Sequence, residues 1–224
     1  MPLNLAHLDY KKYTWISQLS LLFALHDGYL NRDNGDEIDI TLNCVYDTQV
    51  RFLVRNHQFD DVDNLYATTT NDKYNFLSEI IEGVPGLKVS TIINLGAGIG
   101  VAAIYLAKIF GDAAIKAFES DELDFAQLQK NLTLNAPASR TIDAYSQCDD
   151  AMHEIKALDL LVCSPRTINQ FLLGSKLMKL IAIARVIVVD SFLSNDDQNS
   201  FLEYISPLNF SHGYFEQTMV CWKH

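Results

Sequence analysis

A glycine-rich stretch followed by a carboxylate is the pattern in this sequence that most clearly indicates chemistry. The stretch comprises Asn94, Gly96, Ala97, Gly98 and Gly100. Glu119 follows about 20 residues later, where a carboxylate ending the next strand can accept hydrogen bonds from both hydroxyls of a ribose. Glycines between a strand and a helix let a ligand approach the backbone, and the start of the helix offers free N–H groups. The pattern therefore predicts a site for an adenosine-containing ligand.

The spacing of the glycines separates two kinds of nucleotide ligand. A dinucleotide fingerprint reads G-x-G-x-x-G. In this sequence Gly100 comes one residue early, and Val101 occupies the place of the third glycine. The G-x-G-x-G form is typical of class I methyltransferases that use S-adenosylmethionine, so we expect this cofactor.

Residues 93–135 resemble an FkbM-type methyltransferase. The family's first motif, D-x-G-A-x-x-G, is similar to residues 94–100. Its second, F-E-P-x…L…N…N, is similar to Phe118, Glu119, Ser120, Asp121, Leu128, Asn131 and Asn135. The resemblance extends over about residues 38–190. It implies a class I methyltransferase fold and O-methylation of a small-molecule, sugar-like or lipid-like acceptor. It also implies that the cofactor is bound by Asn94, Gly96, Ala97, Gly98, Gly100, Glu119 and Ser120.

Two positions depart from the family pattern. Asn94 stands where the first motif has an acid. At the end of the fourth expected strand, where the family has an Asp-x-Glu-Gly stretch close to the methyl group, Ser164 and Arg166 replace the two carboxylates. The pair Ser164-Pro165 partly resembles the N-P-P-aromatic element of amino-group methyltransferases, with Arg166 in place of the aromatic residue.

Methyl transfer makes few demands on acid–base residues, because the sulfonium is already a strong electrophile and alignment supplies much of the rate. A hydroxyl acceptor still benefits from a base as its proton leaves. Asp190, at the end of the fifth expected strand, is the leading base candidate, with His153 and His212 as weaker ones. Arg166 can hold an anionic substrate by a charge-assisted pair. The predicted catalytic residues are therefore Asp190, Ser164 and Arg166.

Alternating strands and helices must position these residues. Short apolar runs predict strands over 91–95, 114–118, 141–145, 158–163 and 186–189. Helical periodicity predicts helices over 101–110, 123–134 and 168–181. Strands and helices that alternate in this way predict an α/β fold, a mostly parallel, doubly wound Rossmann-like sheet covered on both faces. The tail, 213–222, predicts one antiparallel edge strand. Asn131 and Asn135 are expected to end a helix and cap a turn.

The residues before the first strand of this sheet have a different pattern. Helical spacing of apolar residues predicts a helix over 13–25, and strict alternation on both sides of a polar turn predicts a β-hairpin over 38–54. A further helix is expected over 72–81. We therefore expect an extension of helix and β-hairpin, residues 1–89, packed on a methyltransferase domain, residues 90–224.

Charge and composition narrow the expected partners. Lys and Arg number 17 and Asp and Glu 28, a formal net charge of −11. A field of this sign repels a phosphate backbone, which predicts a small-molecule acceptor and no nucleic acid partner. The four cysteines form no C-x-x-C pair, which predicts no metal site and a reducing compartment. The start of the sequence lacks a signal-peptide pattern, and the first apolar run, 19–25, is too short to span a bilayer. These features predict a soluble cytoplasmic protein with no membrane partner.

Two other functions stay open. Ser164 and Arg166, in place of the expected carboxylates, favour a catalytically degenerate methyltransferase fold that serves as a binding or partner protein. The glycine-rich stretch and Glu119 alone are also compatible with an NAD-dependent dehydrogenase.

Overall fold

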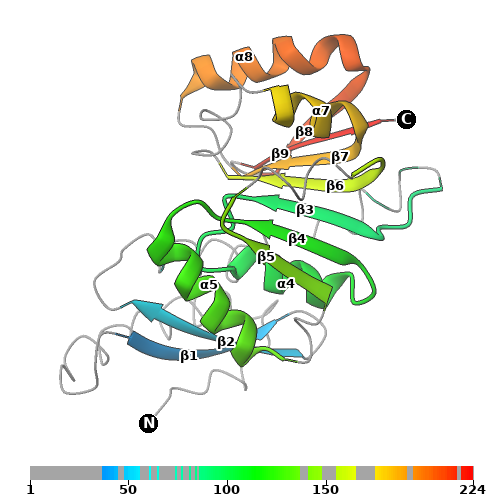
Figure 1. Ribbon diagram of the computed structural model, residues 1–224. Coiled ribbons are helices and arrows are strands. Elements are labelled where there is room, and N and C mark those ends of the chain that lie inside the picture. The colour runs from blue at the N-terminus through cyan, green and yellow to red at the C-terminus, as the bar shows by residue number, and fades with distance from the viewer. Residues whose placement is uncertain are drawn as a thin grey trace.

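The computed structural model describes residues 37–44, 48–55, 86–136, 141–147, 155–164, 175–190, 194–215 and 218–223, together with Asp61, Leu65, Tyr74, Leu77, Ile81 and Val84 (Figure 1). The predicted helix over 13–25 lies outside the described residues. Of the predicted helix over 72–81, Tyr74, Leu77 and Ile81 are described, and all three are buried. The division of the chain at residue 89 stays a prediction.

Seven strands form one sheet in the order β5-β4-β3-β6-β7-β9-β8. The strands from β5 to β7 run parallel, and β9 lies antiparallel between β7 and β8. The order along the chain reverses between β3 and β6, which is where open α/β sheets bind ligands. The bounds are β3 Thr91–Leu95, β4 Ala114–Phe118, β5 Ile142–Tyr145, β6 Leu158–Cys163, β7 Ala184–Val189, β8 Phe210–Phe215 and β9 Thr218–Lys223.

Helices cover both faces of the sheet, because its central strands are apolar on both sides. Figure 1 shows α4 and α5 on one face and α7 and α8 on the other, and a separate buried core lies on each side. Side-chain caps fix two of the helix starts: Asp121 accepts from the first turn of α5, and Ser194 from that of α8. The bounds are α4 Val101–Ile109, α5 Glu122–Leu134, α7 Ser175–Ile183 and α8 Asn195–Ile205, followed by the 3₁₀ turn η4 Ser206–Leu208.

The β-hairpin forms a small sheet of its own. It consists of β1, Glu37–Cys44, and β2, Thr48–Arg55, paired antiparallel, in agreement with the hairpin predicted over 38–54. In Figure 1 this hairpin lies beyond α4 and α5 as seen from the large sheet. Its buried residues Ile40, Phe52 and Val54 belong to the same core as the apolar residues of α4. The hairpin is therefore packed on the α4–α5 side of the fold.

The predicted doubly wound, mostly parallel sheet is confirmed, and its departures from expectation lie in the last third of the chain. The tail forms two strands, so the expected single edge strand over 213–222 is wrong: β8 is the edge, and β9 is inserted beside β7. Helix α8 was not expected, because only Phe201 and Ile205 are buried in an otherwise polar segment. Of the helix expected over 168–181, the described part begins at Ser175 and ends at Ile183.

Candidate functional site

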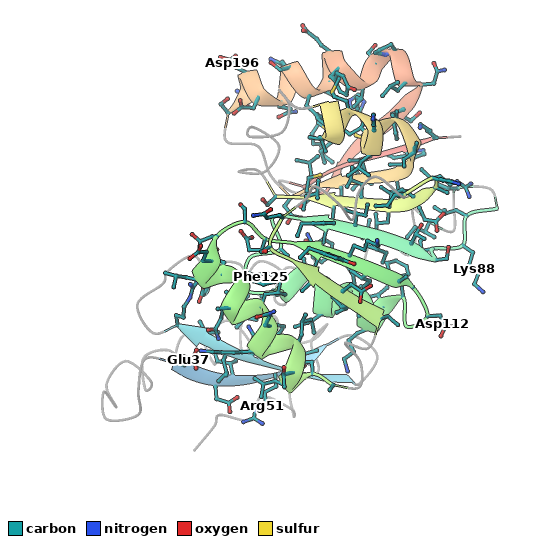
Figure 2. All side chains as sticks on the ribbon, in the orientation of Figure 1. Glu37, Arg51, Lys88, Asp112, Phe125 and Asp196 are labelled. Carbon is teal, nitrogen blue, oxygen red and sulfur yellow. The ribbon has the colours of Figure 1, made fainter. Side chains whose placement is uncertain are left out.

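The carboxyl ends of four neighbouring strands form one continuous edge. Backbone hydrogen bonds just past the strand ends join them. Gly96 and Ala97 N–H groups donate to the Phe118 carbonyl, both at 2.9 Å, and the Ser164 N–H donates to the Leu95 carbonyl at 3.0 Å. The Asp190 N–H donates to the Cys163 carbonyl at 3.1 Å. The edge therefore brings together, in spatial order, the predicted site residues Glu119, Gly96, Ser164 and Asp190. Figure 2 shows Lys88 and Asp112 near the amino ends of the strands, at the opposite end of the sheet.

The glycine loop between β3 and α4 has the left-handed backbone that its composition suggests. Gly96, Gly98 and Gly100 have φ values of 69°, 54° and 93°. At Gly100 an added Cβ would lie 2.5 Å from Leu128 Cδ1, on the buried side of α5. Gly100 therefore permits a close approach of α5 to the start of α4, in addition to the turn itself. Ala97, between the glycines, is buried.

The Glu119 carboxylate holds the glycine loop and the start of α5 together. Its Oε2 accepts from the Gly98 N–H at 2.7 Å, and its Oε1 accepts from the Asp121 N–H at 2.9 Å. Glu119 is half-buried, while the neighbouring Ser120 is exposed. Each carboxylate oxygen has two lone-pair directions, so both retain capacity for a hydroxyl donor. The residues that the two motifs predicted to cooperate are thus in direct contact.

Asn94 is a buried amide whose acceptor has no partner among the described residues. The residue is 1% exposed, and its strand neighbours Ala117 and Val162 are apolar. Strand alternation places Asn94 on the same face as Ile92, which is the face that α4 and α5 cover. No donor among the described residues reaches Asn94 Oδ1. A buried unpaired acceptor costs roughly 1–3 kcal/mol, so this atom fits a ligand that brings a donor.

Asp190 is held by a tyrosine from a distant part of the chain. The Tyr74 hydroxyl donates to Asp190 Oδ1 at 2.9 Å and lies 3.1 Å from Oδ2. Tyr74 is fully buried, and burial together with the Asp190 charge raises its pKa well above the usual range. The tyrosine therefore stays protonated as a donor. Thr218 also donates to the Asp190 backbone carbonyl at 3.2 Å, which ties the start of β9 to this end of β7.

The other predicted acid–base residues are not all brought to this edge. Ser164 is half-buried at the end of β6. Arg166 and His153 lie outside the described residues. His212 is exposed on the outermost strand, β8, with its ring edge-on to Tyr214, and it pairs with Cys221 away from the carboxyl ends. The structure therefore does not bring His212 together with Ser164 and Asp190.

Sequence reasoning missed two residues. Tyr74 was expected only as part of a helix. Asn131 was expected to end a helix, but it lies inside α5, fully buried, and its amide donates to the Ile99 carbonyl in the glycine loop at 2.9 Å. Asn135 does cap the end of α5, as predicted. The available signal was the regular spacing of amide side chains along α5.

The described part of the chain adds two observations. No three His, Cys, Asp or Glu side chains gather there in an arrangement that would bind a metal ion. Within the same ranges, no helix combines the length and the apolar character needed to cross a bilayer.

Solved methyltransferase structures share this fold. Precorrin-6y C5,15-methyltransferase from Geobacter metallireducens has a TM-score of 0.55 at 14% identity, covering 70% of this chain and 90% of that chain. Magnesium protoporphyrin IX methyltransferase from Synechocystis PCC 6803, solved with bound SAM, has a TM-score of 0.52 at 14% identity, covering 73% and 83%. The chain therefore has the fold of class I S-adenosylmethionine-dependent methyltransferases, as predicted.

In sequence, this chain is similar to a ribosomal RNA methyltransferase. The ribosomal RNA large subunit methyltransferase G of Shewanella oneidensis is 25% identical over 159 residues, which are 66% of this chain and 42% of that protein. The match thus spans less than half the length of that relative. No family model matches the chain, so the FkbM-type resemblance stays a prediction.

The expectation of no nucleic acid partner is contradicted by this relative, whose name assigns it ribosomal RNA as substrate. The expectation rested on the net charge of −11. Net charge describes the average field of the molecule, whereas nucleic acid binding depends on where the basic residues lie. The inference from charge to partner was therefore unsound.

Proposed function

We propose that this chain is an S-adenosylmethionine-dependent methyltransferase. The observation that carries the proposal is the contact between Glu119 and the Gly98 N–H at the point where the strand order reverses. A ribose-binding carboxylate and a glycine loop meet there, which is the arrangement that an adenosine-containing cofactor needs. The shared methyltransferase fold and the G-x-G-x-G spacing support the choice of S-adenosylmethionine over a dinucleotide.

The ends of β3 and β4 form what we call the cofactor half of the site: Asn94, residues 96–100, and Glu119. In this proposal Glu119 accepts from the ribose hydroxyls, with Ser120 beside it, and the glycines of the loop let the cofactor approach the backbone. The unpaired Asn94 Oδ1 accepts from a donor such as the cofactor's ammonium group. When bound, S-adenosylmethionine supplies an electrophilic methyl group.

The ends of β6 and β7 form the acceptor half: Ser164, Asp190 and Tyr74, with Arg166 as a further candidate. Asp190 receives the proton when the acceptor is a hydroxyl, and Tyr74 holds its carboxylate in place. Ser164 offers a hydroxyl close to the acceptor. Where the acceptor is an amine, alignment alone contributes more and the need for Asp190 as a base falls.

For the acceptor itself we propose ribosomal RNA, which is the substrate class that the name of the Shewanella relative gives. The partial likeness of Ser164-Pro165 to the N-P-P-aromatic element of amino-group methyltransferases points the same way. O-methylation of a small or sugar-like molecule is the second candidate, favoured by Asp190 and by the FkbM-type resemblance. A methyl-transfer assay with labelled cofactor separates the two. One arm uses ribosomal RNA, the other a small-molecule extract, both from cells that lack this chain.

Cofactor binding tests the core of the proposal. We expect calorimetry to detect binding of S-adenosylhomocysteine to the wild-type chain. Glu119→Ala should weaken it by about 1.5–3 kcal/mol, or roughly 10–150-fold in Kd, since hydrogen bonds to a charged group are lost. Glu122→Gln, in the exposed first turn of α5, is the matched control and should leave Kd within about twofold.

Two outcomes would count against the proposal. A folded wild-type chain that binds neither S-adenosylmethionine nor its demethylated product lacks the proposed activity. Binding without turnover on RNA or on small molecules would instead favour a degenerate fold that serves as a binding protein. Fluorescence titration with reduced NAD separates the dehydrogenase alternative.

A further inference from the structure

Three amide side chains repeat every four residues along α5. We call Gln127, Asn131 and Asn135 the amide row. They are 2%, 0% and 7% exposed, so all three are buried away from solvent. Buried amides need partners, and these find them on strand β2 of the hairpin rather than within the helix alone.

The amide row covers the free edge of β2. Gln127 Nε2 donates to the Leu53 carbonyl at 2.8 Å, and Asn131 Oδ1 accepts from the Leu53 N–H at 2.7 Å. Asn135 accepts from the Arg51 N–H at 3.0 Å and donates to its carbonyl at 2.6 Å. Four residues of helix rise about 6 Å and two residues of strand about 6.7 Å, so the step from Asn131 to Asn135 matches the step from Leu53 to Arg51, while Gln127 shares Leu53 with Asn131. The strand edge is thus paired by side chains in place of another strand.

Asn131 alone in the row also reaches the glycine loop. Its Nδ2 donates to the Ile99 carbonyl at 2.9 Å, while its distance to the Leu53 carbonyl is 3.3 Å. Ile99 lies between Gly98 and Gly100, and the Gly98 N–H is the group that Glu119 accepts from. The side-chain bonds of Gln127 and Asn135 go to β2 and, for Asn135, to the Asn131 carbonyl. One buried amide therefore connects the hairpin to the loop.

We propose that Asn131 is a positioning residue for the cofactor, and that through it the β1–β2 hairpin is part of the cofactor site. The inference rests on the proposed function. A hydrogen bond to the Ile99 carbonyl fixes the orientation of the Ile99–Gly100 peptide unit, next to the residue whose N–H Glu119 accepts from. Glycine peptides rotate easily, so this loop needs such an anchor to keep the Gly98 N–H directed at Glu119. Preorganisation of this kind lowers the entropy lost on binding.

Paired variants separate positioning from general stability. Asn131→Ala removes the contacts with both β2 and the loop, whereas Asn135→Ala removes only contacts with β2 and within α5. We expect both to lower the free energy of unfolding measured with urea. Only Asn131→Ala should raise the Kd for S-adenosylhomocysteine, by tenfold or more, while Asn135→Ala stays within threefold of wild type. Gln127→Ala is a second control with the expected behaviour of Asn135→Ala.

A ligand-free measurement keeps the two proposals distinguishable. Hydrogen exchange of the Gly98 and Gly100 amides should speed up at least tenfold in Asn131→Ala and little in Asn135→Ala. If Asn131→Ala does not fold, Asn131→Leu fills the same space without the donor and replaces it. Equal loop exchange and equal Kd in the two variants would overturn the positioning role. Absence of cofactor binding in wild type would overturn the proposed function, and loop exchange would then decide the role of Asn131 by itself.

Discussion

The two halves of the site are built from contacts of different range. In the cofactor half, Glu119 meets Gly98 across a sequence separation of 21 residues. In the acceptor half, Tyr74 meets Asp190 across 116 residues. The first contact joins adjacent parallel strands and needs only one strand–helix–strand unit. The second needs Tyr74, from the segment before β3, to be packed against the carboxyl end of β7.

This difference in range indicates which half can vary between proteins. A local unit carries its own geometry, which depends little on distant segments. An acceptor half assembled from distant segments can change without disturbing the cofactor half.

The halves also differ in how a carboxylate is satisfied. Glu119 accepts from two backbone N–H groups, so any residue type except proline that keeps the backbone of Gly98 or Asp121 in place supplies the donor. Asp190 accepts from a side-chain hydroxyl that a single substitution removes. The cofactor half should therefore be sensitive to changes in backbone conformation, and the acceptor half to changes in side chains.

The largest expected effect comes from the backbone of the cofactor half. Gly100→Ala places a Cβ at a φ of 93° and 2.5 Å from Leu128 Cδ1. We expect backbone strain to lower the free energy of unfolding by about 1–3 kcal/mol. Overpacking against Leu128 should lower it by a further ~1–3 kcal/mol. Urea unfolding measures the sum, and calorimetry should show weakened cofactor binding.

Two other glycines separate these contributions. Gly86 has a φ of 66° and open space around its Cβ position, so Gly86→Ala should show the strain alone. Gly111 has neither a positive φ nor a neighbour within 4 Å, so Gly111→Ala should change the stability by less than about 1 kcal/mol. If all three substitutions have equal effects, close packing of α5 on the loop is not what requires a glycine at position 100.

The contrast between local and long-range contacts also explains which features could be predicted from the sequence. Strands β3, β4 and β6 have the bounds expected, because each is a short apolar run between turn residues. The motif predicted that Glu119 and the glycine loop belong to one ligand site, and adjacent parallel strands bring them together, whereas the hydrogen bond between them was not predicted. Tyr74 could not be assigned to Asp190, because no local pattern encodes a contact made by tertiary packing.

Polar segments were the other source of error. Helix α8 begins with Asn195, Asp196 and Asp197, which hydrophobic periodicity does not recognise; its cap at Ser194 was the usable signal. Asn131 was interpreted from the general preference of Asn for helix ends. Its burial depends on the hairpin being packed beside α5, which the sequence of the helix does not show.

The next largest effect is expected from a substitution in the acceptor half. Tyr74→Phe removes the hydroxyl that Asp190 accepts from and should lower the free energy of unfolding by about 1–2 kcal/mol at pH 7. Cofactor Kd should stay within about twofold, while kcat on the identified acceptor falls. A tenfold change in cofactor Kd would contradict the separation of the two halves.

Tyr74 also predicts a pH dependence. Burial and the Asp190 charge raise its pKa above the ordinary value of 10.0. The folded chain then holds this proton more tightly than the unfolded chain, so the associated stability is fully present below pH 10 and declines as the pH rises above it. Urea unfolding between pH 8 and 11 should show a steeper loss in wild type than in Tyr74→Phe.

The smallest effect is expected at the amino ends of the strands, away from the cofactor half and the acceptor half of the site. Asp159 Oδ2 accepts from the N–H groups of Ser90 and Thr91, at 2.9 and 3.0 Å, and from their hydroxyls. Burial by itself raises the pKa of Asp159, but these hydrogen bonds outweigh it, and the pKa lies below the ordinary value of 3.8. Its contribution is therefore present above about pH 4 and is lost as the pH falls through the lowered pKa.

Asp159→Asn should lower the free energy of unfolding by about 1 kcal/mol at pH 7, since the carboxylate is partly exposed and water screens it. The difference from wild type should shrink as the pH falls below 4. Asp143→Asn, at the exposed position of β5, is the control and should change the stability by less than about 0.5 kcal/mol. Because Asp159 joins β3 to β6 only at their amino ends, cofactor Kd should not change. A higher Kd in Asp159→Asn would mean that the cofactor half depends on the pairing of these strands along their whole length. Its geometry would then be less local than the contact between Glu119 and Gly98 indicates.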